Sequence, residues 1–205
     1  MQELNIEELK FKLTGTTPLI LHNCRTANPL DPYTRAMKPL TSKKKKTDID
    51  YRELARIEWE AGLYLQGGVV VIPAQNLDAC FQNAAKHFKM GEQYKRGAQV
   101  SEIYIPLQYK GPKIDIGNGH ESIPIEALNK HYDRYKCQDI VNVKKNKVLR
   151  TRPKFEDWSL SVTIQIDKSI FDNRSIVDIV TVAGQYVGLC EHRPRMGKFE
   201  VEIIQ

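Results

Sequence analysis

The sequence contains no long hydrophobic run. No stretch approaches the ~20 apolar residues that a membrane-spanning helix needs, and the N-terminus MQELNIEELK lacks the basic-then-apolar order of a signal peptide. We therefore expect a soluble, cytoplasmic protein without a membrane partner. The cysteines are too widely spaced for a zinc knuckle or a small disulfide framework, so we expect reduced thiols at Cys24, Cys80, Cys137 and Cys190.

Familiar catalytic signatures are missing as well. The chain has no HExxH, no serine elbow and no GxxxxGK phosphate loop, and residues 188–198 have the wrong spacing for the last of these. The histidines are scattered, at positions 22, 87, 120, 131 and 192. We predict no cofactor and no metal site.

Positive charge is in excess. The chain has 205 residues, with 31 Lys and Arg against 25 Asp and Glu, which gives a formal net charge of +6. The sequence pI is about 9.0. This balance favours a polyanionic partner. The length suits a single domain, residues 1–205, that carries insertions.

Alternation of apolar and polar residues predicts several strands. The first contains Leu9, Phe11 and Leu13 and continues into TGTTPLILH, and SLSVTIQID alternates just as cleanly. Further strands are expected in VVVIPA, ending at Pro73, in SEIYIPLQY, with Ile103, Ile105 and Leu107 inward, and in FEVEII. VNVKKNKVL suggests a hairpin with its tip at 144–146.

Two apolar stripes at the 3.6-residue period predict helices. One lies in 75–91, where Asn76 is placed to cap the helix and Cys80 and Phe88 belong to the apolar stripe. The other runs from Ile176 to Val187 and ends at Gly188. YKRGAQV between the first helix and the next strand is interpreted as a basic turn.

Two insertions interrupt this pattern. Residues 23–66 are interpreted as a long basic loop followed by a helix, because prolines stand at 29, 32 and 39 of the loop and a capping-box-like pair, Thr47 and Asp50, precedes a helix ending at Gly62. Glu53, Glu58 and Glu60 give that helix a solvated face. The loop either contacts a ligand or is disordered. Residues 110–138 are interpreted as an irregular insertion with a short helix at 125–132.

Without the insertions, the order is strand, helix, strands, helix, strand. This predicts an α+β protein with a ferredoxin-like, RRM-like βαββαβ core and long insertions. The free face of such a sheet can present RNA bases, but no intact RNP1-like string is present, so we do not expect an ordinary RNA-recognition motif.

The segment 184–204, GQYVGLCEHRPRMGKFEVEII, places basic residues between Gly188 and Gly197. Glycines let the backbone approach a ligand, and guanidinium forks match phosphate oxygens, so this loop is a candidate anion site. The alternative is a solvated basic turn. Together with the other basic loops and the start of the first helix, the candidate nucleic-acid-binding residues are Arg25, Arg35, Lys38, Lys43, Lys44, Lys45, Lys46, Gln75, Asn76, Lys95, Arg96, Arg150, Arg152, Lys154, His192, Arg193, Arg195 and Lys198.

Three stretches, which cover about a quarter of the chain, resemble the RAMP superfamily of CRISPR-associated proteins. TGTTPLILHN resembles the family's opening strand, VVVIPAQNLDACFQNAAKHF its strand-to-helix element, and GLCEHRPRMGKFEVE its C-terminal glycine-rich loop. The family's Gly-Ser-Ser is replaced here by Ala74, Gln75 and Asn76. The resemblance is to the repeated backbone subunits of CRISPR effector complexes, in a divergent or virus-encoded (phage) form.

The resemblance implies an RNA-binding subunit that oligomerises along a guide-like single-stranded RNA in an antiviral ribonucleoprotein, with other effector subunits and target nucleic acid as further partners. Two alternatives remain: a RAMP-type endoribonuclease, and a virus-encoded, sequence-tolerant single-strand binder. For catalysis the resemblance offers Asp31, as a metal-dependent RNA-cleaving aspartate, and His192, as a general base. A proline-flanked aspartate in a turn is ordinary loop chemistry, which favours a structural role for Asp31, and His192 has no visible partner in the sequence.

Overall fold

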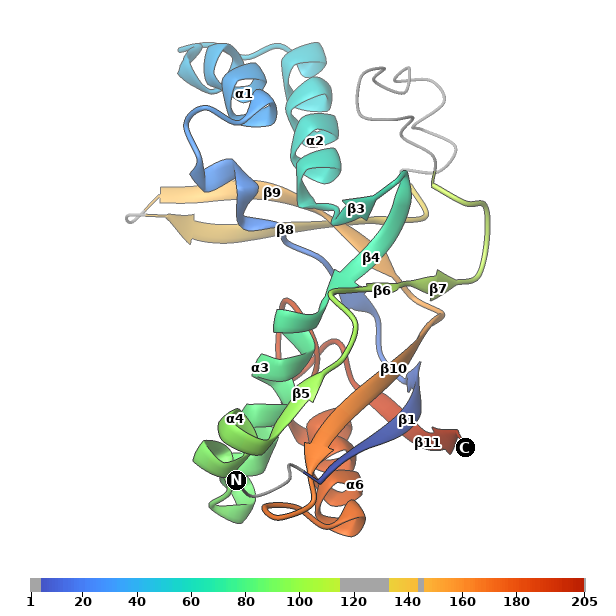
Figure 1. The fold of residues 1–205 in the computed structure, drawn as a ribbon. Helices are drawn as coiled ribbons and strands as arrows, with labels where there is room; N and C mark the ends of the chain where they lie inside the picture. Colours follow the sequence, from blue (N-terminus) through green and yellow to red (C-terminus); the bar gives the residue numbers. More distant parts are fainter. Residues whose placement is uncertain (1–4, 115–132, 144–145, 205) are drawn as a thin grey trace. The chain divides into compact units, whose positions relative to one another are not determined.

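The computed structural model describes residues 5–114, 133–143 and 146–204 of an α+β chain with antiparallel sheets (Figure 1). The chain divides into two compact units. Unit 1 comprises Met1–Leu19, Val69–Gly111 and Phe155–Gln205, and unit 2 comprises Ile20–Gly68 and Pro112–Lys154. Both predicted insertions fall mainly in unit 2. None of the helices in the described ranges is long and apolar enough to cross a membrane.

Unit 1 is built on an antiparallel sheet. Its strands are β1 (Ile6–Gly15), β5 (Ala98–Val100), β10 (Trp158–Asp167) and β11 (Phe199–Ile204), in the order β11-β1-β10-β5. A short strand, β7 (Gln108–Tyr109), also pairs with β10. Phe11 lies opposite Val162, and Leu13 lies opposite Leu160. The predicted alternation is confirmed here, since Leu160, Val162, Ile164 and Ile166 are all buried.

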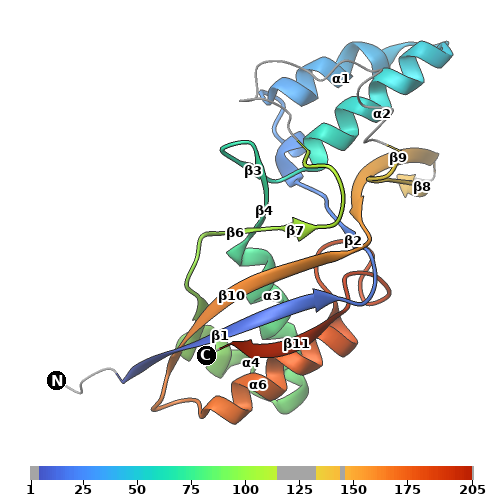
Figure 2. The same ribbon diagram turned by 90° about the vertical axis from the view of Figure 1, so that its right-hand side faces the viewer.

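Helices lie on one side of this sheet (Figure 2). They are α3 (Ala74–Ala85), α4 (Gly91–Gly97) and α6 (Asn173–Val182), and a π-helical turn, Ala183–Val187, extends α6. Asp172 is the N-cap of α6 and its side chain accepts a hydrogen bond from the Ser175 N–H. The buried residues of α6 include Ile176, Ile179 and Val180. The predicted helix end at Gly188 is confirmed, with Gly188 at a φ of 77°.

Part of the prediction for 75–107 is wrong. α3 ends at Ala85, followed by a 3₁₀ turn, Lys86–Phe88, so Phe88 is exposed instead of lying in the apolar stripe. Asn76 does not cap α3, because the chain enters the helix from strand β4 (Val69–Pro73) and Pro73 holds the N-cap position without a side-chain bond.

Two further differences follow in the same region. The expected turn in YKRGAQV is instead α4 followed by β5. Ile105 of β6 (Tyr104–Pro106) is buried as expected, but Ile103 precedes that strand and is exposed.

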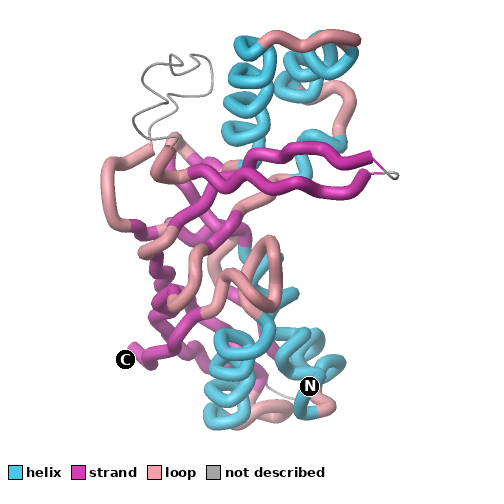
Figure 3. The backbone as a smooth tube through the Cα atoms, turned by 180° about the vertical axis from the view of Figure 1, so that it is seen from behind, coloured by secondary structure: helices cyan, strands magenta, loops and turns pink. Residues whose placement is uncertain are grey.

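Unit 2 contains two helices and a long hairpin. α1 (Pro32–Ser42) follows a 3₁₀ helix (Cys24–Ala27), and α2 (Asp48–Gly62) precedes β3 (Leu65–Gln66). β8 (Lys136–Val143) and β9 (Asn146–Phe155) run side by side as an antiparallel hairpin (Figure 3), and β2 (Leu19–Ile20) joins them in the order β2-β9-β8. Trp59 is buried in this unit, and its Nε1–H donates to the Tyr135 carbonyl at 2.7 Å.

The largest correction concerns the basic loop predicted at the start of the 23–66 insertion, which contains α1. Asp31 is the N-cap and Pro32 occupies the first helical turn, where the missing N–H of proline costs nothing. Pro39 lies inside the helix and removes one internal hydrogen bond, which the helix tolerates. Of these prolines, Pro32 therefore marks the start of a helix, and Pro39 interrupts the hydrogen bonding within it.

Two other predictions for unit 2 are confirmed, the helix with its capping box and the hairpin. The Thr47–Asp50 capping box is present and α2 ends at Gly62, as predicted. The hairpin is confirmed, since Val143 pairs with Asn146, while its tip at 144–145 lies outside the described residues. The short helix expected at 125–132 also lies outside them, and the insertion is not irregular from Lys136 onward, because β8 begins there.

Candidate nucleic-acid interface

Charge is divided unequally between the two units. Unit 2 contains 19 Lys and Arg against 11 Asp and Glu, and unit 1 contains 12 against 14, so their formal charges are +8 and −2. The excess positive charge of the chain therefore belongs to unit 2. A polyanion is drawn to such a surface by long-range attraction before any specific contact forms.

The C-terminal loop of unit 1 is closed at its base by backbone hydrogen bonds. The Leu189 N–H donates to the Gly197 carbonyl at 2.9 Å, and the Gly197 N–H donates to the Pro18 carbonyl at 2.8 Å. Gly197 has a φ of +71°, and a Cβ atom there would lie 2.0 Å from the Leu189 oxygen. The position therefore requires glycine, and the two ends of the loop are held together.

The tip of this loop presents its cations to solvent. His192, Arg193 and Arg195 are exposed, and the His192 carbonyl accepts from the Arg195 and Met196 N–H groups at 3.1 and 3.0 Å in a tight turn. Within the described part of the chain, neither guanidinium has an ion-pair partner. Lys198 is half-buried, and its N–H donates to Thr17 Oγ1 at 2.9 Å.

The loop lies against the start of α3. Cys80 of α3 donates to the Gly188 carbonyl at 3.1 Å, and Asn76 Nδ2 donates to the Cys190 sulfur at 3.7 Å. Burial raises the pKa of the Cys80 thiol to about 12, and the nearby charge of Arg193 opposes that shift. The structure therefore brings Cys190 of the loop to Asn76 in the first turn of α3, which has no side-chain cap, while Arg193 lies nearer Cys80 and Asn83, further along the helix. Gln75, in the same first turn, is exposed.

Lys95 and Arg96 are not part of that group. They lie in the last turn of α4 and line a separate pocket of about 610 Å³ with Asp78, Gln165 and Asp167. The pocket beside the C-terminal loop, of about 550 Å³, contains none of these residues. Asp78 and Asp167 balance the two cations of the α4 pocket, whereas Arg193 and Arg195 of the loop outnumber Glu191, so the loop is the better site for a phosphate.

Several basic residues of unit 2 that were predicted to bind nucleic acid make contacts within the protein instead. Arg25 Nε donates to Asp31 Oδ2 at 2.9 Å, and its guanidinium lies 4.6 Å from the centre of the Tyr33 ring. Lys43 contacts Asp50 at 2.5 Å and holds the pKa of that carboxyl down at about 2. Lys46 donates to two backbone carbonyls of the turn after α1.

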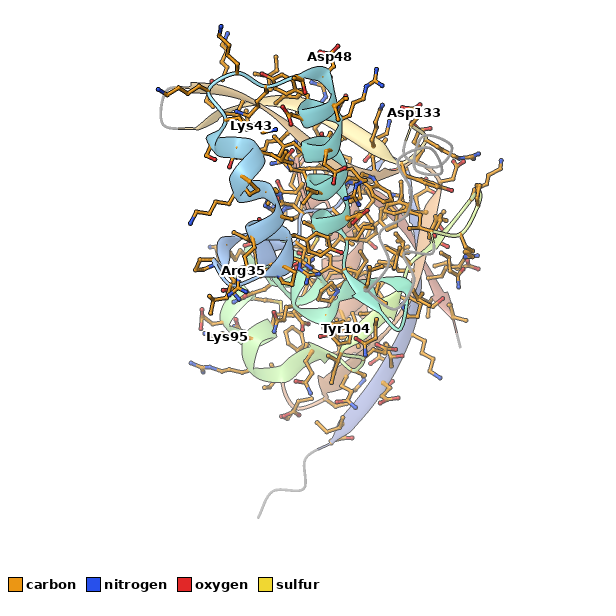
Figure 4. The ribbon with its side chains drawn as sticks, turned by 90° about the horizontal axis from the view of Figure 1, so that it is seen from above. Arg35, Lys43, Asp48, Lys95, Tyr104 and Asp133 are labelled. Carbon is orange, nitrogen blue, oxygen red and sulfur yellow. The ribbon has the colours of Figure 1, made fainter. Side chains whose placement is uncertain are left out.

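The remaining cations around α1 are available to a ligand. Arg35, Lys38, Lys44 and Lys45 are exposed. Figure 4 shows Arg35 on α1 and Lys43 near the turn that leads to Asp48 at the start of α2.

Strand β9 carries the other candidates. Arg150 Nη1 contacts Glu58 Oε1 at 2.5 Å, and the Thr151 N–H donates to Glu58 Oε2 at 2.9 Å. Arg152 Nε donates to His22 Nδ1 at 3.1 Å, and the Lys154 N–H donates to the Tyr135 carbonyl at 2.8 Å.

His22 and Glu58 were missed by the sequence analysis. Their partners are 130 and 92 residues away, so no local pattern marks them. The expectation that Glu58 and Glu60 face solvent is wrong. Glu58 holds β9, and Glu60 is buried beside Arg56, which it contacts at 2.6 Å.

The two catalytic candidates have structural partners. Asp31 accepts from the Tyr33 N–H through Oδ1 and from Arg25 through Oδ2, so it caps α1 and anchors Arg25. His192 forms the turn of the C-terminal loop through its carbonyl. Among the described residues, no group of three or more His, Cys, Asp or Glu side chains could hold a metal ion.

The sheet face away from the helices is polar. Lys10 pairs with Thr163, and Lys12 pairs with Ser161 on one side and Glu202 on the other. The aromatic residues of β1, β10 and β11, which are Phe11, Trp158 and Phe199, are buried on the helix side. These strands therefore offer no aromatic platform on which bases could stack.

No protein-family model and no curated protein matches the chain. Among solved structures, it is similar to a chain from the cryo-EM structure of the type III-B Cmr-beta complex bound to cognate target RNA, with a TM-score of 0.52 and 10% sequence identity. The alignment covers 97% of this chain and 61% of that chain, so the protein spans about three-fifths of its neighbour. At this identity, the likeness is one of fold.

Proposed function

We propose that the chain is an RNA-binding backbone subunit of a CRISPR-type ribonucleoprotein. The observation that carries the proposal is the likeness in fold, over nearly the whole chain, to part of a complex bound to target RNA. The order β1, α3, β5, β10, α6, β11 along the chain, with β11-β1-β10-β5 across the sheet, supports a ferredoxin-like core of the RAMP type in unit 1.

The contacts to RNA are proposed to be contacts to its phosphates. The positive charge of unit 2 supplies attraction, while the polar sheet face of unit 1 offers no stacking. In unit 1, the exposed Arg193 and Arg195 stand on a loop that contacts the first turn of α3 through Cys190 and Asn76, and this helix start has no side-chain cap, so its N–H groups and dipole favour an anion. Such binding tolerates many sequences, as a guide-binding subunit requires.

Binding along a strand is proposed to occur by repeated copies of the chain. A head-to-tail interface between copies generates an open helix unless the rotation closes it. Mixed with long RNA and examined by electron microscopy, the protein should form filaments whose length follows that of the RNA. Single bound copies at saturating protein would contradict this arrangement.

Fluorescence polarisation with labelled single-stranded RNA, between about 50 and 200 mM salt, tests the proposed function. Each phosphate neutralised on a single strand contributes a slope of about 0.7 in log affinity against log salt, so affinity should fall steeply. The RNA should be recovered intact with and without Mg²⁺. Salt-insensitive binding would contradict the proposal, and cleaved RNA would favour an endoribonuclease.

A further inference from the structure

Unit 2 contains a pocket of about 650 Å³ that the proposed function does not require. Residues from the 3₁₀ helix Cys24–Ala27, from α1, from α2 and from β9 line it, and all of them belong to unit 2. Small-molecule sites in proteins typically measure roughly 300–1,000 Å³. The pocket is thus large enough for a ligand much bigger than a water molecule or a bare ion.

One side of the pocket is held in place by hydrogen bonds. Glu58 is nearly buried, and its two oxygens bind the Arg150 side chain and the Thr151 N–H. Arg152 donates through Nε to Nδ1 of His22, which restricts both side chains. Because these side chains are already ordered, a ligand that binds them loses little additional entropy.

The charges in the lining favour a phosphate group. Lys38, Arg150 and Arg152 contribute three positive charges, and Glu58 contributes one negative charge. A phosphate monoester carries about −1.5 to −2 at neutral pH, which closely balances this excess. Lys38 is exposed on α1 and faces the pocket from a different element than β9, so the two elements can hold one phosphate from two sides.

The rest of the lining suits a heterocyclic base. Met37 and Ala27 provide apolar surface, and methionine adapts its shape to a flat ring. Thr26, Thr34 and Thr41 add hydroxyl groups. Thr34 Oγ1 donates to the Thr26 carbonyl, and Thr41 Oγ1 donates to the Lys38 carbonyl, so both hydroxyl oxygens keep the ability to accept a bond from a base.

We propose that this pocket binds a single nucleotide, with its phosphate at Lys38 and Arg152 and its base against Met37. The inference deepens the proposed function, because the nucleotide can be one unit of a bound RNA strand turned out of the stack. A free mononucleotide has the same recognition chemistry. The two sources are separated by the ligands used in the test.

The test measures binding of 5′-mononucleotides to the full chain by isothermal titration calorimetry. Each of the four is compared with its nucleoside and with inorganic phosphate. The variants are Lys38→Ala, which removes a pocket cation, and Lys147→Ala, which removes an exposed lysine of β9 that does not line the pocket and is not a candidate RNA contact. Both variants should keep the wild-type melting temperature, because neither ammonium group has a described partner.

We expect one bound mononucleotide per chain, at least tenfold weaker binding in Lys38→Ala, and less than a twofold change in Lys147→Ala. Nucleosides and inorganic phosphate should each bind at least tenfold more weakly than the nucleotide. Equal losses in the two variants would overturn the proposal, since they would show attraction to charge alone. So would a wild-type chain that binds no mononucleotide, or one that binds phosphate equally well.

A second comparison identifies the source of the ligand and separates this inference from the proposed function. A short single-stranded RNA and the same strand without its bases are titrated into wild-type protein and Lys38→Ala. If the pocket holds a nucleotide of the strand, removal of the bases weakens wild-type binding and has little effect on the variant. If the pocket instead binds a free nucleotide, removal of the bases should change the RNA affinity of wild-type protein and of Lys38→Ala equally. In either case, RNA that binds with steep salt dependence while no mononucleotide binds would overturn the pocket alone and leave the proposed function standing.

Discussion

Replacing Arg193 and Arg195 together by alanine should weaken binding of single-stranded RNA more than replacing Lys44 and Lys45 together. Both variants lose two positive charges from exposed positions. The arginines stand on a loop whose ends are joined by the Leu189–Gly197 hydrogen bond. The lysines stand in the turn after α1, and no described residue holds their side chains. Because the two variants lose the same charge, the difference between their RNA affinities measures how much the fixed position of the arginine side chains contributes.

The two losses differ in size. At about 0.15 M salt, two phosphate contacts that act only through counterion release, with a slope of about 0.7 each, are worth roughly tenfold in affinity. A well-formed hydrogen bond to a charged group is worth about 1.5–3 kcal/mol, so two such bonds are worth at least about 3 kcal/mol, or roughly a hundredfold. We expect a loss of about tenfold for the lysine pair and of a hundredfold or more for the arginine pair.

Fluorescence polarisation at several salt concentrations measures both quantities. The salt slope should fall by about 1.4 in each variant, because each loses two contacts. Lys43 and Lys46 are left unchanged, since they bind Asp50 and the backbone of the turn. Both variants must keep the wild-type melting temperature. If the lysine pair loses as much affinity as the arginine pair, the C-terminal loop is only a solvated basic turn.

Three further outcomes test the fold that supports the site. Gly197→Ala places a Cβ 2.0 Å from the Leu189 oxygen, and Gly67→Ala is its control, because a Cβ at Gly67 meets nothing within 4 Å and costs only the left-handed backbone strain of about 1–2 kcal/mol. In urea, Gly197→Ala should therefore lose more unfolding free energy than Gly67→Ala. Equal losses would contradict the closed loop. Asp50, with its pKa lowered by Lys43 from 3.8 to about 2, adds stability that is complete above pH ~4 and lost as the pH falls to ~2. Asp50→Asn should therefore melt below wild type at pH 7 but not at pH 2, and a constant difference would refute the ion pair. Iodoacetamide at pH 8 should label the exposed Cys24 and spare Cys80, because burial and a pKa of about 12 keep the Cys80 side chain a thiol. Mass spectrometry reads out the labelling. If both cysteines are labelled in the folded protein, the packing of Cys80 is contradicted.

The strands and helix stripes of unit 1 could be predicted because their signal is local. Apolar and polar residues alternate from Leu160 to Ile166, so one face of β10 is expected to be buried whichever strands or helices pack against it. Helix α1 could not be predicted in the same way. Its prolines are compatible with a loop, and only the capping of α1 by Asp31, together with the contact between Asp31 and Arg25, shows that Pro32 begins a helix.

The candidate site shows the same division between local and distant information. Arg193 and Arg195 are neighbours in sequence and lie between glycines, so their shared loop is visible in the chain. The pairs Arg150–Glu58 and Arg152–His22 join residues far apart in sequence. Lys43 and Lys46 look like free charges in a lysine run, yet the fold uses them. A count of basic residues therefore overestimates the number available to RNA.

The charges of unit 1 restrict where RNA can bind on it. Across the open sheet face, Lys12 lies beside Glu202, and Thr14 lies beside Glu200, so the cations of β1 are balanced by the acidic edge strand β11. A phosphate chain laid over that face would meet these carboxylates without gaining any aromatic stacking in return. The C-terminal loop is more favourable, since its exposed arginines, Arg193 and Arg195, outnumber its one carboxylate, Glu191. On unit 1, RNA is therefore expected at the loop and not across the sheet.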